Sequence, residues 1–158
     1  MNRIAIVTAA LALAACGGSS GPATHFSATM SPANEVPSTT SSGTGSATYT
    51  VDGGTVSYSV TFSGLTGPAT AGHIHVGPAG VIGGVTVPFS PPAAASGTFT
   101  GTFTAANVAV ATTPDGGVSV AAGDYNGLLT LMRAGNTYTN IHTSINKGGE
   151  IRGQNQPQ

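Results

Sequence analysis

Polar and apolar residues alternate along most of this chain, which is the pattern of strands with one buried face. The clearest example is SATYTVDGGTVSYSVTFSGL at residues 46–65, where two alternating runs flank Asp52-Gly53-Gly54. A glycine-containing turn between β-branched and aromatic runs is typical of a β-hairpin. The pattern therefore predicts two antiparallel strands joined at residues 52–54.

Short runs of the same kind recur along the chain, each bounded by Gly, Pro or Asn. They are HFSATM, TAGHIHV, GVTVPF, SGTFTGTFT, NTYTNIHT and GEIRGQ. About eight short antiparallel strands at this spacing predict an all-β fold, a Greek-key sandwich or barrel. One segment differs, because in GDYNGLLTLMRAG apolar residues recur at helical spacing and Gly135 can end a helix. We therefore expect one short helix near residues 125–134.

The first 15 residues, MNRIAIVTAALALAA, carry a basic residue near the start, Arg3, and continue as an apolar run. The run is too short for a bilayer-spanning helix and fits a secretory signal peptide. It ends in LAAC, residues 13–16, which looks like a bacterial lipobox with Cys16 as the lipidated residue. The alternative is an ordinary secretory signal in which the cysteine occurs by chance. The lipobox predicts export and membrane attachment through Cys16, at the periplasmic face of a membrane or the cell surface.

Residues 16–24 follow as the lipidated cysteine and a flexible Gly/Ser-rich tether, residues 25–154 as one domain, and residues 155–158 as a tail. Without the signal peptide, three basic residues remain against five acidic ones, so the formal charge is 3 − 5 = −2. Such a chain offers no basic stripe, and no nucleic-acid partner is expected. Charged residues make up 6% of the sequence where about 25% is usual, which suits an extracytoplasmic β protein.

Two histidines one residue apart occur in AGHIHVGPAG, residues 71–80. On a strand, His73 and His75 share one face while Ile74 and Val76 share the other. The aliphatic pair is the natural core pair, so the histidines are expected to point away from the core. Their backbone positions are then about 6.6 Å apart, which lets both imidazoles reach one metal ion.

The same alternation predicts that Ile141 and Ile151 point inward near the end of the chain. Outward positions are then Tyr138, Asn140 and His142 on one strand and Glu150, Arg152 and Gln154 on the next. In an antiparallel hairpin, residues that face each other point to the same side of the sheet. Because the outward positions are even-numbered on both strands, the numbers of two facing residues must sum to an even value. A sum of 292 places His142 opposite Glu150, and a sum of 294 places it opposite Arg152. Either register puts a charged group beside His142.

Three histidines with an open position form a common site for zinc or copper. We therefore predict a mononuclear metal site with His73, His75 and His142 as ligands. Asn140, Glu150 and Arg152 are expected to support it by hydrogen bonds or to line its pocket. The alternative is a hydrogen-bonded network that closes the sheet without metal. His25, beside the tether, is expected to be incidental.

Three segments carry a resemblance to a known family: HFSATMSPANEVPSTTSSGTGSATYTV, AGHIHVGPAGVIGGVTVPF and YTNIHTSINKGGEIRGQ. Together they resemble the CHRD domain, a module of animal chordin and of many bacterial secreted proteins and lipoproteins. The resemblance covers about residues 25–154, and its most specific parts are HIHVG and NIHTSINKGGEIRGQ. The family commonly has Asn-Pro where this chain has Asn146-Lys147, a change within a turn. The resemblance implies a β domain and assigns no reaction to it.

The histidine pattern is also similar, more distantly, to that of copper/zinc superoxide dismutases. These are Greek-key β-barrels that present an HxH pair and further histidines on the outer face of the barrel. His73, His75 and His142 match that ligand pattern in kind. The chain lacks the disulfide cysteines of the dismutases and has too few histidines for a bridged two-metal site. The similarity therefore implies a superoxide-dismutase-like fold and a single-metal site rather than dismutase activity.

These observations predict a lipid-anchored extracytoplasmic CHRD domain with one copper or zinc ion. The competing hypothesis is a binding module without metal, which recognises an envelope protein or polysaccharide through the same face. The sequence leaves catalysis open and favours a non-catalytic role. A catalytic role would be metal-dependent redox chemistry on a small oxygen species.

Overall fold

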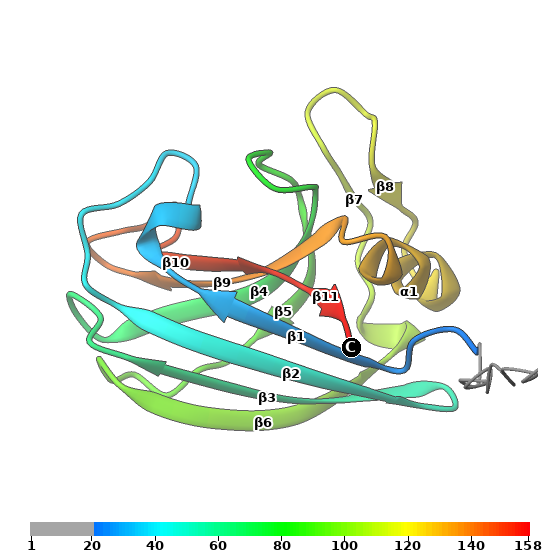
Figure 1. Ribbon diagram of the computed structural model, residues 1–158, viewed down its shortest axis with the longest axis horizontal. Coiled ribbons are helices and arrows are strands. Elements are labelled where there is room, and N and C mark those ends of the chain that lie inside the picture. The colour runs from blue at the N-terminus through cyan, green and yellow to red at the C-terminus, as the bar shows by residue number, and fades with distance from the viewer. Residues whose placement is uncertain (1–20) are drawn as a thin grey trace, which may run out of the picture.

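Two antiparallel β-sheets pack face to face in this computed structural model, which describes residues 21–158 (Figure 1). The predicted signal peptide, Cys16 and the first part of the tether lie outside the described residues. The prediction of an all-β fold with one short α-helix is confirmed. The helical segments are the 3-10 turns η1 (Pro32–Asn34) and η2 (Ala105–Asn107) and the α-helix α1 (Tyr125–Arg133). The strands are β1 (His25–Met30), β2 (Thr44–Asp52), β3 (Thr55–Ser63), β4 (Ala69–Val76), β5 (Val85–Phe89), β6 (Gly97–Thr104), β7 (Ala111–Thr112), β8 (Ser119–Val120), β9 (Thr137–Thr143), β10 (Ile151–Gln154) and β11 (Gln156–Pro157).

The strand order is β11-β1-β2-β3-β6 in the first sheet and β10-β9-β4-β5 in the second. A separate two-stranded ribbon consists of β7 and β8. The predicted hairpin is confirmed, since β2 pairs with β3 and the turn lies between Asp52 and Thr55. Gly53 in this turn has a φ of 55°, which glycine adopts without steric strain. Pairing of β4 with β9 brings the HxH segment next to a strand that is distant in the sequence.

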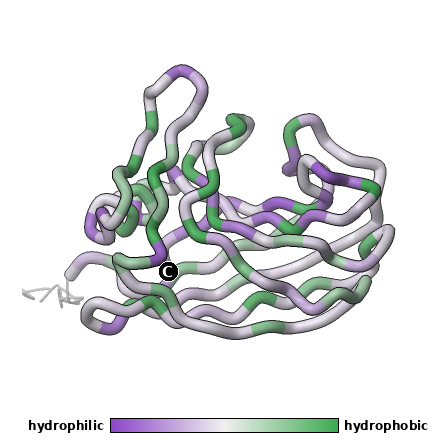
Figure 2. The backbone as a smooth tube through the Cα atoms, turned by 180° about the vertical axis from the view of Figure 1, so that it is seen from behind, coloured by the Kyte–Doolittle hydropathy of each residue, from purple (hydrophilic) through white to green (hydrophobic). Residues whose placement is uncertain are grey.

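The hydrophobic core fills the space between the two sheets. The inward positions predicted from the alternation, Ile74, Val76, Ile141 and Ile151, are all part of this core. The first sheet contributes Phe26, Tyr49, Val60, Phe62 and Phe103 from its inner face. Figure 2 shows the alternation of hydrophobic and hydrophilic positions along the strands. The period of two in the sequence therefore sets which side of each sheet is buried.

The outward face of the second sheet is also buried, which the alternation alone does not predict. All residues of β9 are buried, and so are outward-pointing residues of the neighbouring strands. The loops before β2, after β4 and before β10 lie over this face (Figure 1). His142 is 9% exposed and Arg152 only 1%. The polar side chains of this face thus form an enclosed layer between the sheet and its covering loops.

The predicted helix is confirmed as α1, whose first turn is capped by Asp124. The Asp124 carboxylate accepts a hydrogen bond of 2.8 Å from the backbone N–H of Gly127. Leu128, Leu129 and Met132 of α1 pack into the core, and Gly135 follows with a φ of 68°.

The fold continues past residue 154, where the domain was expected to end. Asn155 is fully buried, its Oδ1 accepts from the Thr139 hydroxyl at 2.8 Å, and its Nδ2 donates to the Thr137 hydroxyl. The following residues form β11, which pairs with β1 at the edge of the first sheet. The expected tail is therefore part of the first sheet.

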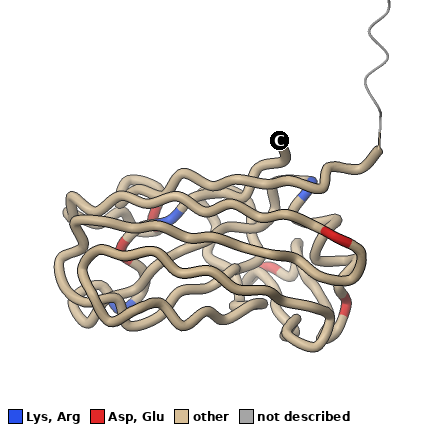
Figure 3. The backbone as a smooth tube through the Cα atoms, turned by 90° about the horizontal axis from the view of Figure 1, so that it is seen from below, with Lys and Arg blue, Asp and Glu red and all other residues tan. Residues whose placement is uncertain are grey.

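Charged residues are few along the described chain (Figure 3). Between residues 21 and 158, no helix reaches the length and hydropathy needed to cross a bilayer.

Candidate metal centre

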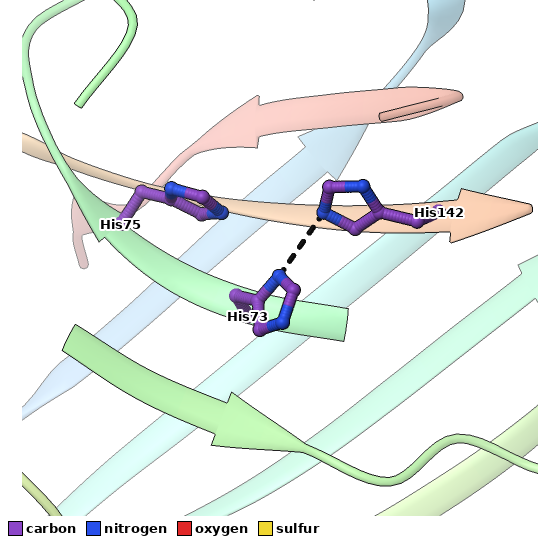
Figure 4. Close-up of side chains that lie close together, drawn as sticks. All are labelled: His73, His75 and His142. Atoms are coloured by element: carbon purple, nitrogen blue, oxygen red, sulfur yellow. Dashed lines mark hydrogen bonds between the residues drawn. The ribbon is translucent and has the colours of Figure 1, made fainter. Parts of the chain in front are cut away.

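Three of the four histidines meet on the covered face of the second sheet. His73 and His75 come from β4 and His142 from β9, and their side chains point toward one another (Figure 4). Each offers a ring nitrogen, and these three atoms lie within 4.8 Å of one another. His25 lies at the start of β1, with its ring beside Thr50. The β4–β9 pairing thus brings the HxH pair and the distant third histidine together.

One pair of histidine nitrogens has the spacing of two ligands around one metal ion. The Nδ1 atom of His73 lies 3.0 Å from the Nε2 atom of His142. Bonds of about 2.0–2.1 Å to a metal place neighbouring ligand atoms about 2.9–3.4 Å apart. The ring centroids of His73 and His75 are 5.2 Å apart, so the third ring is within reach of the same point.

Backbone carbonyls fix which ring nitrogens carry protons. The Nδ1 atom of His75 lies 2.9 Å from the Gly83 oxygen, and that of His142 lies 2.9 Å from the Lys147 oxygen. A carbonyl can only accept, so both Nδ1 atoms donate and both Nε2 atoms hold a lone pair in the neutral rings. The Nε2 atom of His75 is buried and has no hydrogen-bond partner. A metal ion would satisfy that atom, and the carbonyls would orient its ligands in the usual way.

Burial also keeps the imidazoles in the form that binds metal. The pKa of His73 and of His75 is lowered to about 4, mainly by burial, and for His73 the nearby ring of His142 contributes to the lowering. Burial lowers the pKa of His142 as well. All three rings are therefore neutral near pH 7, and a metal would not have to displace protons from them.

Of the predicted supporting residues, Asn140 lies next to a histidine and Arg152 lies one side chain away. The Oδ1 atom of Asn140 is 3.1 Å from the Nε2 atom of His142. The Arg152 guanidinium carbon lies 3.4 Å above the centre of the Tyr138 ring, and Tyr138 stacks on His75 with centroids 4.8 Å apart. Arg152 therefore reaches the histidine cluster through Tyr138 and does not touch a histidine ring.

Glu150 corrects one of the sequence expectations. The hairpin has the register that sums to 292, since Ile141 pairs with Ile151 and Arg152 with Asn140. The carboxylate nevertheless turns away from His142 and accepts hydrogen bonds from the covering loops and from the end of β9. Its donors are the Ser41 hydroxyl at 2.6 Å, the Thr66 backbone N–H at 2.6 Å and hydroxyl at 2.7 Å, the Thr143 hydroxyl at 2.7 Å and the Asn146 amide at 3.0 Å. Glu150 thus holds the loops together and does not touch the histidines.

Sequence reasoning did not identify Glu35, which lies in the loop between β1 and β2. Its side chain is 7% exposed, and its Oε1 atom is buried without a hydrogen-bond partner. Burial raises the pKa of Glu35 to about 7, although the positive charge of Arg152 and hydrogen bonds to its carboxylate oppose the rise. The only signal in the sequence was its rarity, because it is one of five acidic residues in the chain. Alternation says nothing about how a loop residue folds back over a sheet.

Three neutral imidazoles whose ring nitrogens converge form a donor set for zinc or copper. Comparison with protein families finds one match: a model described as the CHRD domain matches residues 26–155. Neither the curated proteins nor the solved structures include a match to the chain.

Proposed function

This chain belongs to the CHRD domain family, and from that premise we propose that it is a lipid-anchored extracytoplasmic domain that binds one copper or zinc ion. The ligands are His73, His75 and His142. Copper and zinc are the candidates because both accept imidazole nitrogen and tolerate three-histidine sites.

The observation that carries the proposal is the unpartnered Nε2 atom of His75. Buried polar atoms without a partner are rare in folded proteins, because an unmade hydrogen bond costs about 1–3 kcal/mol. Here the lone pair of that atom points into a cluster with two other histidines, each of whose rings is neutral near pH 7. A bound cation accounts for the atom, the cluster and the two carbonyl contacts together.

A bound metal would supply Lewis acidity, and copper would add one-electron redox chemistry. The part of this chain's own residues is to hold the rings in one tautomer and to limit access of water. His73 is the most exposed of the three histidines, so small molecules would approach from its side. Redox chemistry on a small oxygen species remains a secondary proposal, and it requires that copper rather than zinc supports turnover.

The lipid anchor is proposed from the LAAC segment and Cys16. The described chain is consistent with a short tether, since the Arg133 side chain already holds the backbone oxygen of Ala23 at 3.1 Å. The domain would therefore stay near the membrane surface, with a few residues between Cys16 and the first fixed contact.

Replacing Cys16 by alanine should release the protein from membranes, because acylation of that residue is the proposed attachment. Cell fractionation with detection of the protein would show the parent with the membranes and the variant in a soluble extracytoplasmic fraction. A Ser19→Ala variant in the tether serves as control and should fractionate like the parent. A parent protein found only in the soluble fraction would exclude the anchor.

A metal-free binding module is the second candidate function, and one cavity favours it. A cavity of about 300 Å³ lies between the β1–β2 and β4–β5 loops, with Glu35, Arg152 and Gln154 among its lining residues. This volume is at the lower end of the range for small-ligand sites. A carboxyl, a guanidinium and an amide can bind hydroxyl or amide groups of a polysaccharide or protein partner.

Elemental mass spectrometry on the protein from residue 22 onward, purified without a histidine tag, tests the metal. We expect about one copper or zinc ion per chain, and its loss in the His73→Gln/His75→Gln double variant, since one remaining imidazole cannot hold the ion. A His25→Gln variant is the matched control and should keep the metal. If the parent stays metal-free after reconstitution with either ion, the metal proposal is wrong and the binding module takes its place.

A further inference from the structure

The side-chain amide of Asn140 directs its oxygen atom, not its nitrogen, toward His142. Asn140 is 2% exposed, and its Oδ1 atom lies 3.1 Å from the Nε2 atom of His142. Because His142 donates its Nδ1 proton to the Lys147 oxygen, Nε2 carries a lone pair in the neutral ring. Two acceptors therefore face each other with no proton of their own between them. The His73 Nδ1–H group can donate to the Nε2 atom of His142, but the amide oxygen of Asn140 is then left without a donor.

The Glu35 carboxyl lies on the other side of this amide, close enough that Asn140 lowers its pKa. A Cβ atom placed on Gly149 would overlap the Oε1 atom of Glu35 and would lie 2.9 Å from the Nδ2 atom of Asn140. The carboxylate oxygen and the amide nitrogen thus both lie over Gly149, although Oε1 accepts no hydrogen bond in this structure. An amide N–H donates and a carboxylate accepts, so the nearby carboxylate favours the orientation with Nδ2 toward Glu35 and Oδ1 toward the histidines. Turning the amide over would place two oxygens against each other.

We propose that the Oδ1 atom of Asn140 is the fourth ligand of the metal ion and that Glu35 is the positioning residue that holds it there. This inference rests on the proposed metal site. The two distances to the His142 Nε2 atom, 3.0 Å from the His73 nitrogen and 3.1 Å from the Asn140 oxygen, are edges of one coordination polyhedron. Ligands bonded at about 2.0–2.2 Å have separations of this size.

A fourth protein ligand changes what the site can do. Three histidines alone leave a position for water, as catalytic zinc sites do, whereas four protein ligands close the coordination shell. An amide oxygen is a weaker ligand than an imidazole nitrogen for copper and zinc. Asn140 therefore keeps water off the resting ion and yields its place to an incoming anion. The site is closed at rest and opens by exchange of this one ligand.

Electron paramagnetic resonance of the Cu(II)-loaded protein tests this assignment. The parent should show three nitrogen ligands and no solvent deuteron bound to copper after transfer to D₂O. In Asn140→Ala a water should take the fourth position, with a changed spectrum, a bound deuteron and tighter azide binding. Asn126→Ala, on the exposed surface of α1, is the matched control and should behave like the parent.

The role of Glu35 is tested by two substitutions that differ in one property. Glu35→Gln keeps an oxygen that can accept from the Asn140 amide and should retain the parent spectrum. Glu35→Ala removes the acceptor and should shift the spectrum and the azide affinity toward those of Asn140→Ala. A purely structural role of Glu35 would affect thermal stability in both variants without changing the copper spectrum.

The outcomes separate this inference from the metal proposal. A parent that binds no copper contradicts the metal site itself. A parent that binds copper but shows a bound solvent deuteron, or has the same spectrum and azide affinity as Asn140→Ala, overturns the role of Asn140 and leaves the three-histidine site standing. The deuteron measurement on the parent decides the matter even if the alanine variant does not fold.

Discussion

Replacing Glu150 with alanine should lower the free energy of unfolding by about 3–5 kcal/mol, because a buried carboxylate that binds several donors would be lost. Glu150 has no exposed surface, and four residues donate to its side chain. These donors come from segments before β2, before β4, at the end of β9 and before β10. The substitution therefore leaves buried donors unpaired in several loops at once.

Urea unfolding monitored by circular dichroism measures this effect, with Asp52→Ala as the control. Asp52 is an exposed acidic residue at the end of β2, so its loss should change stability by less than about 0.5 kcal/mol. A loss of under about 1 kcal/mol in Glu150→Ala would contradict the structural role.

The stability that Glu150 contributes should decrease as the pH falls. Burial alone would raise the pKa of Glu150, but hydrogen bonds from Ser41, Thr143 and Thr66 lower it to about 2. The contribution of the folded carboxylate is then complete above its ordinary pKa of about 4.5 and is lost as the pH falls toward 2. The difference in stability between parent and Glu150→Ala should shrink over this window.

The sheets could be predicted from the sequence because their signal is local. A strand with one buried face repeats every two residues, so β1 to β6, β9 and β10 could be recognised from short windows. Helix α1 could be recognised from its spacing of 3.6 residues and from the glycine that follows it. The two-residue strands β7, β8 and β11 are too short to show either period.

The candidate site was predictable only in part, for the same physical reason. Alternation placed His73, His75 and His142 on one face. The rule that facing residue numbers sum to an even value left two registers for β9 and β10, and the structure has one of them. Neither argument includes the loops. The burial of that face, the contacts of Glu150 and the position of Glu35 all depend on loop residues that fold back over the sheet.

Loop backbone matters as much as loop side chains at this site. The Gly83 and Lys147 carbonyl oxygens set the tautomers of His75 and His142, and a carbonyl group gives no signal in a sequence pattern. Gly83 has a second contact, since its backbone N–H donates to the Tyr138 hydroxyl at 3.2 Å. The loop after β4 is therefore a structural part of the proposed metal centre.

Replacing Gly83 with alanine should weaken zinc binding by about 10–100-fold, the range found when a group that orients a ligand is lost. A Cβ atom at this position would overlap the Val76 carbonyl oxygen, which belongs to the backbone and cannot rotate away. The loop must shift, and the carbonyl that accepts from the Nδ1 atom of His75 shifts with it. His75 would then lose its fixed tautomer and orientation, although all three ligands remain.

Competition titration of zinc against a chromophoric chelator measures this change, with thermal unfolding as a check that the variant folds. Gly148→Ala is the matched control, because Gly148 lies in the loop over His142 and a Cβ there meets no atom within 4 Å. Its zinc affinity should equal that of the parent. If a folded Gly83→Ala variant also binds zinc like the parent, the Gly83 carbonyl does not orient His75. The ligand geometry would then come from the strands alone.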